Sequence, residues 1–220
     1  MLCIRVYSPN YLNLRWRSLD WDQNRGTYHA FISLGAMCQT AHQLRRLGLR
    51  RFSGPLDWFI TNSSPKLSHL LNTRFNGFME LNNLRHINIV DNHYVLRDTV
   101  YQVDSYHDFP VHYNPNQLYP QFKEQVDRRI SRFLNTIKTG PVCFVRTHTS
   151  SSEARLLEQA LYNISHRDFR MLIVNLHNQR GKGVIYEDWG LQRVSSVTIP
   201  SGRDWRGSNH HWDLIMKGFN

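Results

Sequence analysis

The fold of this chain is constrained most by two short, continuously apolar runs with a helical segment between them. Residues 142–146 read VCFVR and residues 170–176 read RMLIVNL, and residues 152–164 between them have the spacing of an amphipathic helix. A strand that is apolar on both sides must be covered on both faces, and a crossover helix makes two such strands parallel. The sequence therefore predicts a β-α-β unit in a parallel sheet that is buried between helices.

A second pairing of strand and helix lies near the N-terminus. Residues 28–34 (YHAFISL) are apolar and β-prone and stop at Gly35, and residues 36–47 have the apolar spacing of a helix that Gly48 ends. Residues 119–137 carry a long apolar stripe that predicts a further helix. Weaker patterns predict a helix at 65–73, strands at 86–90, 98–103 and within 184–199, and a short helix at the C-terminus.

These elements predict an α/β fold with a mainly parallel sheet covered by helices. The 220 residues fit one domain. Residues 1–27 have no clear period, so we expect an irregular N-terminal extension there and the α/β domain over residues 28–220.

Composition limits the classes of function. The net charge of +10 allows an anionic substrate, but the charge is spread along the chain and no DNA- or RNA-binding motif is present, so nucleic acid is not the expected partner. The N-terminus does not resemble a secretory signal, and no apolar run could span a membrane. Three cysteines without a CxxC pair suit a reducing compartment. We expect a cytoplasmic protein, and the sequence does not indicate an oligomeric state.

Polar groups follow three of the predicted strands at the point where each ends. The first strand leads through Ser33 and Gly35 to Cys38, the second ends at Arg146 and His148, and the third ends at Asn175. In open α/β sheets, ligands bind at the carboxyl ends of parallel strands. We therefore expect a site at this edge, although any one of these residues taken alone fits the start of an ordinary loop.

Cys38 is the sharpest single candidate. It lies at the start of a predicted helix, where free amides and the helix dipole stabilise a thiolate. Gly35 would let the backbone approach a substrate closely, and nearby N–H groups could form an oxyanion hole. The alternative is a buried structural thiol, which suits Cys143 and Cys3 better.

A nucleophilic cysteine needs a base, and three histidines are candidates. His42 lies four residues after Cys38 on the same helix, His107 follows a predicted strand, and His148 lies at a strand end. Most histidines in any chain have structural roles, so the choice stays open at this level. The adjacent pair His210 and His211 does not make a zinc site, and we expect neither a metal nor a cofactor.

The segment FISLGAMCQTAHQLRRLGLRRFSGPLDW resembles the opening signature of the DUF1796 family, whose members are described as papain-like cysteine peptidases. The matching residues are Ser33, Leu34, Gly35, Cys38, Ala41, Leu44, Pro55, Asp57 and Trp58, with Leu56 in place of the usual Phe. The stretches HDF (107–109), RRISRF (128–133) and FVR (144–146) add to the resemblance, which covers roughly residues 29–200. It implies that Cys38 is the nucleophile, His107 its base and Asp57 an orienting or structural carboxylate.

Three functions remain open from the sequence. The first is a papain-like peptidase or related thiol-dependent hydrolase or acyltransferase that acts on a peptide, amide or thioester; its substrate would contact Ser33, Gly35, Arg146 and His148. The second is a glycosyltransferase-type enzyme that binds an anionic nucleotide-sugar through Arg146. The absence of a DxD or GxGxxG motif weakens this second function. The third is a non-catalytic homologue.

Overall fold

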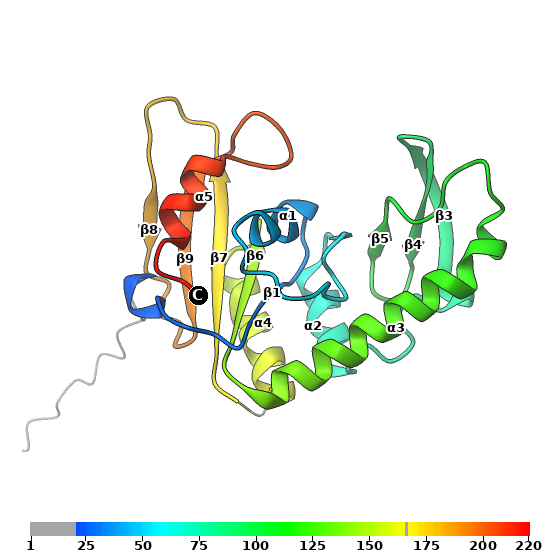
Figure 1. Ribbon diagram of the computed structural model, residues 1–220, viewed down its shortest axis with the longest axis horizontal. Coiled ribbons are helices and arrows are strands. Elements are labelled where there is room, and N and C mark those ends of the chain that lie inside the picture. Colours follow the sequence, from blue (N-terminus) through cyan, green and yellow to red (C-terminus); the bar gives the residue numbers. More distant parts are fainter. Residues whose placement is uncertain (1–20, 166) are drawn as a thin grey trace, which may run out of the picture.

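Two β-sheets lie side by side and share one long helix (Figure 1). This structure, a computed structural model, describes residues 21–165 and 167–220. The larger sheet has five strands. The first four are parallel, which confirms the predicted mainly parallel sheet, and the last is antiparallel. Its strands, in spatial order, are β1 (Ala30–Ser33), β6 (Val142–Thr147), β7 (Phe169–His177), β9 (Val194–Pro200) and β8 (Ile185–Glu187).

The predicted β-α-β unit is β6, α4 (Ser151–Ile164) and β7. The α4 helix starts where the sequence supplies a capping box: Ser150 Oγ accepts from Glu153 N, and the Glu153 carboxylate accepts from Ser150 N at 2.9 Å. Free amides at a helix start need such acceptors. The chain therefore leaves β6 and enters α4 within a few residues, and the end of β6 is tightly placed.

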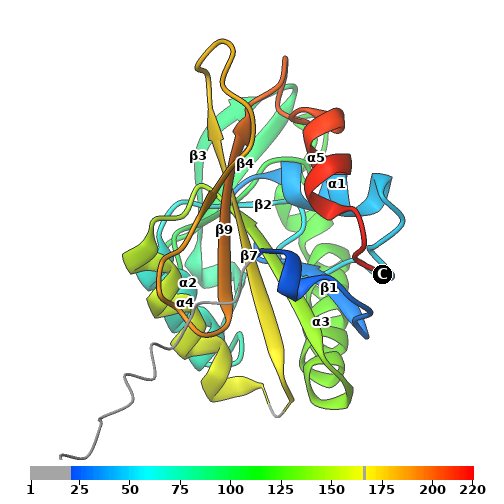
Figure 2. The same cartoon turned by 90° about the vertical axis from the view of Figure 1, so that its left-hand side faces the viewer.

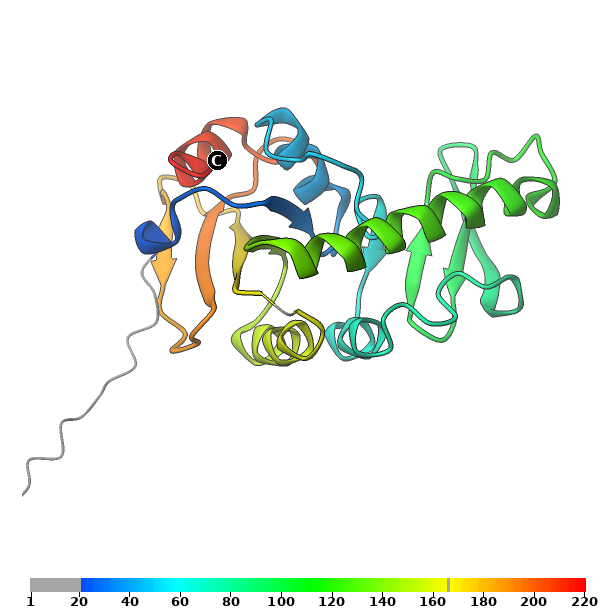
Figure 3. The same cartoon turned by 60° about the horizontal axis from the view of Figure 1, so that its bottom comes forward.

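Helices cover both faces of the larger sheet, because alternate side chains of each strand point to opposite sides. On β6, Val142 and Phe144 belong to one apolar cluster, and Cys143 and Val145 belong to the other. Figures 2 and 3 show one face covered by α1 and α5 and the opposite face covered by α2 and α4. These helices are α1 (Cys38–Arg46), α5 (Asn209–Met216), α2 (Ser64–Asn72) and α4, and α3 (Pro115–Thr139) packs with the second group.

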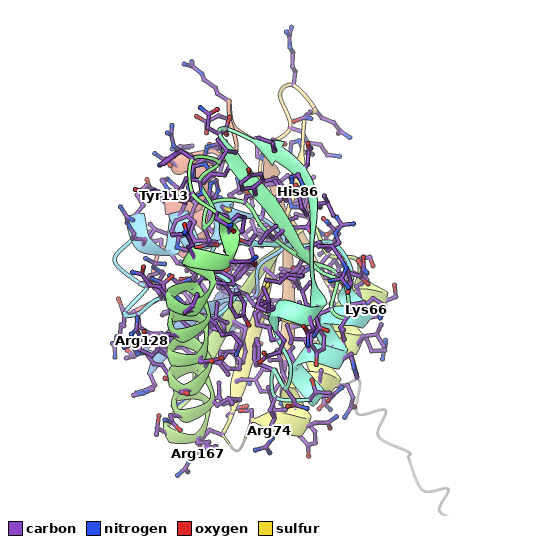
Figure 4. All side chains as sticks on the ribbon, turned by 90° about the vertical axis from the view of Figure 1, so that its right-hand side faces the viewer. Lys66, Arg74, His86, Tyr113, Arg128 and Arg167 are labelled. Atoms are coloured by element: carbon purple, nitrogen blue, oxygen red, sulfur yellow. The ribbon has the colours of Figure 1, made fainter. Side chains whose placement is uncertain are left out.

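The smaller sheet is antiparallel and was not anticipated as a separate sheet. Its order is β2 (Phe59–Thr61), β5 (Val103–Ser105), β4 (His93–Asp98) and β3 (Leu84–Val90), and the short helix η2 (Leu81–Asn83) precedes β3. Viewed from this end of the molecule, His86 on β3 and Arg128 on α3 are exposed (Figure 4). Helix α3 packs against this sheet through Phe122, whose ring centroid lies 6.3 Å from that of Phe59 on β2.

One predicted strand is a turn instead. We expected a strand over residues 98–103, but β4 ends at Asp98 and β5 begins only at Val103. The Asp98 carboxylate accepts from Val100 N at 2.9 Å and from Tyr101 N at 3.0 Å, which satisfies the amides of a turn better than a strand would. The predicted strand at 86–90 forms most of β3.

A short helix lies within residues 1–27, where we expected an irregular N-terminal extension. Residues 1–20, including Cys3, lie outside the described residues, but η1 (Trp21–Asn24) packs against α5. The Trp21 indole is buried, and its Nε1 donates to the Ile215 carbonyl at 2.8 Å. Among residues 21–165 and 167–220, no helix is long and apolar enough to cross a membrane.

The buried side chain of Arg146 joins the two sheets. It lies on β6 and is 2% exposed, and its Nη1 donates to the Leu34 carbonyl at 2.6 Å and to Thr61 Oγ1 at 2.7 Å. Its Nη2 donates to the Thr61 carbonyl at 3.0 Å. Since Thr61 ends β2 and Leu34 follows β1, one guanidinium fixes strand ends from both sheets.

We expect Arg146→Met to destabilise the fold by about 2–4 kcal/mol, because it leaves the buried Leu34 and Thr61 carbonyls without donors while keeping much of the side-chain volume. Urea unfolding followed by circular dichroism measures this. Arg155→Met on the exposed face of α4 is the matched control and should change stability by no more than about 0.5 kcal/mol. Equal effects of the two substitutions would contradict this role for Arg146.

Candidate active site

The carboxyl ends of β1, β6 and β7 lie at one edge of the larger sheet, as predicted. The strands are parallel neighbours, with Ser33 opposite Val145 and Thr147 opposite Val174. Cys38 is the first residue of α1, five residues after β1 ends. The edge that the sequence indicated is therefore formed, and Cys38 lies at it.

A sharp turn delivers the chain from β1 to Cys38. Gly35 and Ala36 both have φ of 71°, a left-handed conformation that costs a residue with a side chain about 1 kcal/mol or more. Thr61 holds this turn, because its Oγ1 accepts from Ala36 N at 2.8 Å. A Cβ on Gly35 would lie 3.0 Å from that same Oγ1. The approach of Thr61 therefore favours glycine at this position, and the close approach of a substrate to Gly35 stays a prediction.

Cys38 and His107 line the same cavity. This Cys38 cavity has a volume of about 740 Å³, and it lies between the start of α1, strand β2 and the loop that follows β5. Its walls are largely aromatic and apolar. It is lined by Met37, Cys38, Gln39, Trp58, Ile60, Asn62, Asp91, Tyr106, His107, Asp108 and Trp205.

The Cys38 thiol is protonated at neutral pH in this conformation. Its pKa is raised to about 11, mainly by burial and to a smaller extent by the charges of Asp108 and Asp57, while its own backbone N–H acts in the opposite direction. Among the described residues, no side chain forms a hydrogen bond with the thiol. The dipole at the start of α1 therefore does not by itself produce the thiolate that we expected.

His107 lies in the loop after β5 and is exposed. Its ring centroid is 6.3 Å from that of His93 and 6.5 Å from that of Tyr106. The next residue, Asp108, is fixed because its Oδ2 accepts from Ser105 Oγ at 2.5 Å. The fixed position of Asp108 therefore helps to hold the neighbouring His107 beside the cavity.

Asp57 is buried beneath the cavity wall and does not line the cavity. Arg50 Nη1 donates to its Oδ2 at 2.5 Å, and Gly54 N donates to the same oxygen at 3.0 Å. The Arg50 guanidinium lies 5.6 Å from the centre of the Trp58 ring. The contacts of Asp57 therefore hold the turn at Gly54 and, through Arg50, the indole that forms part of the wall.

The residues predicted to contact substrate lie in different places. Ser33 and Gly35 are buried in the turn, where Ser33 Oγ accepts from Gly35 N at 3.2 Å, and Arg146 is buried between the sheets. His148 is exposed and lines a smaller cavity of about 210 Å³, the His148 cavity. The two cavities adjoin, because Met37, Gln39 and Trp205 line both.

Two further predicted candidates have structural contacts. Asn175 exchanges two hydrogen bonds with the backbone of Thr149, each 2.9 Å long. His42 lies edge-on to Trp205, with 5.3 Å between ring centroids, and lines neither cavity. His107 is therefore the histidine that shares a cavity with Cys38.

Several lining residues were missed by the sequence reasoning. Two of them could have been found from the sequence. Asp108 directly follows the candidate base His107, and Gln39 directly follows Cys38 in the first turn of α1. Nothing in the sequence indicated Trp205, because it comes from the loop between β9 and α5, far along the chain from Cys38. Within residues 21–165 and 167–220, no three His, Cys, Asp or Glu side chains gather as metal ligands would.

Comparisons with known proteins show the family of this chain. Residues 29–179, more than half of the chain, match the family described as "Putative papain-like cysteine peptidase (DUF1796)". The chain is also similar to an uncharacterized protein of Acanthamoeba polyphaga mimivirus, with 25% identity over 214 residues that cover 84% of this chain and 96% of that protein. No solved structure matches the chain.

The raised pKa of Cys38 predicts how the thiol reacts with iodoacetamide. The rate should climb with pH through the neutral range and should not reach a plateau below about pH 10, because only the thiolate reacts. Asp108→Asn removes a negative charge that raises this pKa, so it should speed alkylation at pH 8 by about two- to tenfold.

Asp127→Asn, an exposed position on α3, is the control and should leave the rate unchanged. Peptide mapping after alkylation separates Cys38 from Cys3 and Cys143. A plateau near pH 7 in the unmodified protein would show that a thiolate is already formed and would contradict this description of Cys38.

Proposed function

This chain belongs to the family described as "Putative papain-like cysteine peptidase (DUF1796)", and on that premise we propose that it is a cysteine-dependent hydrolase or acyltransferase with Cys38 as its nucleophile. One observation carries the proposal: Cys38, at the start of α1, and His107, from the loop after β5, line one cavity. A thiol and an imidazole that face the same space are what nucleophilic catalysis on an amide, peptide or thioester needs.

The protonated state of Cys38 sets the role of His107. Cys38 Sγ bonds to the carbonyl carbon while the thiol proton passes to the imidazole, and the carbonyl electrons move onto the oxygen. The imidazolium then returns the proton to the leaving amine or thiol as the bond to carbon breaks. Water, or an acceptor in a transferase, completes the cycle by attacking the thioester. A base is required because the free thiol is not ionised at neutral pH.

Donors for the developing oxyanion are available beside Cys38. The amides in the first turn of a helix have no acceptor within the helix, and Met37 provides no side-chain cap for α1. Gln39, whose backbone amide belongs to the first turn of α1, also lines the cavity. These groups would hold negative charge on the substrate oxygen, which is the largest contribution in many acyl transfers.

Buried polar residues outside the cavity hold the segments that form the site. Arg146, Thr61 and Gly35 fix the turn that carries Cys38, and Asp57 with Arg50 supports Trp58. We assign them positioning roles. A catalytic role for Asp57 stays a prediction, as does substrate contact by Ser33, Gly35, Arg146 and His148.

The transferase alternative has less support. It would bind an anionic nucleotide-sugar through Arg146, but the Nε, Nη1 and Nη2 of that residue all donate to protein acceptors. The third possibility, a non-catalytic homologue, differs from our proposal only in reactivity at Cys38, which a labelling experiment can measure.

A peptidyl vinyl sulfone tests the pair directly. Cys38 Sγ should add to its β-carbon while the proton goes to the α-carbon, and Cys38→Ala should abolish labelling. His107→Ala should slow labelling by about tenfold or more, because general-base help is lost. Intact-protein mass spectrometry gives the rates.

His86→Ala, on exposed β3, is the control and should react as the unchanged protein does. His148→Ala tests the alternative base. Labelling of Cys143 or Cys3 at the rate of Cys38, or loss of rate in His148→Ala with none in His107→Ala, would contradict the proposed pair.

A further inference from the structure

The lining of the Cys38 cavity has the opposite charge from the chain as a whole. The chain carries a net charge of +10, yet two carboxylates, Asp91 and Asp108, line the cavity. Among the described residues that line it, none is a lysine or an arginine. A group that enters this space therefore meets negative charge, which disfavours an anionic substrate.

Both carboxylates keep acceptor capacity. Asp108 uses one oxygen to accept from Ser105 Oγ, and within the described part of the chain neither Asp91 nor Asp108 has an ion-pair partner within 4.0 Å. Arg129 on α3 attracts Asp108 from a longer distance and lies outside the lining. An ionised carboxylate beside a cavity is stabilised by a cation that enters it.

Two arginines that pack against aromatic residues of the cavity wall are paired with carboxylates. Arg50, beside Trp58, pairs with Asp57 at 2.5 Å. Arg206 lies 5.5 Å from the centre of the Trp205 ring and pairs with Asp204 at 3.2 Å. Each of these two positive charges is therefore partly offset by its own carboxylate partner.

Aromatic rings form much of the wall. Trp58, Tyr106 and Trp205 present aromatic surface, and Met37 and Ile60 add apolar surface. Ring faces attract cations, and they also pack against methylene groups. A long, apolar stem that ends in a positive charge fits such a wall better than a short polar group does.

We propose that the Cys38 cavity binds a substrate group that carries a positive charge on an apolar stem, as the side chain of lysine or arginine in a peptide does. The inference rests on the proposed function, since the group belongs to the acyl part that Cys38 attacks. Asp91 and Asp108 face the charge, and Trp58, Tyr106 and Trp205 pack against the stem.

Such a group would also act on the nucleophile. The Asp108 carboxylate raises the pKa of Cys38, so a cation beside Asp108 offsets part of that effect and makes the thiol easier to ionise. A matching substrate would therefore favour its own attack, and an anionic one would hinder it.

Charged methanethiosulfonates test the inference without any hydrolysis. The Cys38 thiolate bonds to the sulfenyl sulfur of the reagent, methanesulfinate leaves with the electron pair, and the thiol proton goes to solvent. We would compare the trimethylammonium-ethyl reagent with the sulfonato-ethyl reagent, each normalised to its rate with 2-mercaptoethanol. The cationic reagent should label Cys38 at least tenfold faster.

The double substitution Asp91→Asn with Asp108→Asn should reduce this preference to less than threefold. Asp127→Asn, which changes the net charge away from the cavity, should keep it. Equal normalised rates in the unchanged protein, or a preference that survives the double substitution, would overturn the inference. Labelling needs no turnover, so an inactive protein can still show the preference, and an active hydrolase without it would refute this inference alone.

Discussion

The relative position of the two sheets depends on the buried guanidinium of Arg146. Among residues 21–165 and 167–220, no carboxylate lies within hydrogen-bonding distance of it, and it donates instead to Leu34, Thr61 and Thr149. Burial lowers its pKa to about 10, so it stays charged at neutral pH. Burying a charge costs several kcal/mol unless its donors are satisfied, and here the acceptors come from three separate segments. The desolvation cost of the guanidinium is offset only when both sheets supply their acceptors. The positions of the two sheets are therefore coupled.

That coupling positions the candidate chemistry. Cys38 follows the first strand of the larger sheet, after the left-handed turn at Gly35 and Ala36. His107 lies in the loop that follows β5 of the smaller sheet. Thr61 touches both sides, because it ends β2 and also accepts from Ala36. The Cys38 cavity therefore lies at the junction of the sheets, and the relative placement of nucleophile and base depends on how the two sheets meet rather than on either sheet alone.

Sequence patterns predicted the larger sheet well and the junction poorly. The apolar runs of β6 and β7 can only be buried on both faces, so the parallel sheet, its covering helices and the position of Cys38 follow from them. The role of Arg146 does not follow, because a charged residue at a strand end usually faces solvent. Whether it turns inward depends on β2, whose three residues carry no detectable pattern. His107 was indicated by the family resemblance. No sequence feature indicated Trp205, because only the tertiary fold brings its loop to the cavity.

Detection of a covalent intermediate tests the central claim most directly. The protein would be mixed with p-nitrophenyl acetate, quenched in acid at intervals and mapped by mass spectrometry. We predict an acetyl thioester on Cys38 that forms in step with the first release of p-nitrophenol, accumulates in His107→Ala only slowly, and is absent in Cys38→Ala. Release of p-nitrophenol at an undiminished rate in Cys38→Ala, or acetyl groups found only at other residues, would contradict the assignment of Cys38 as the nucleophile.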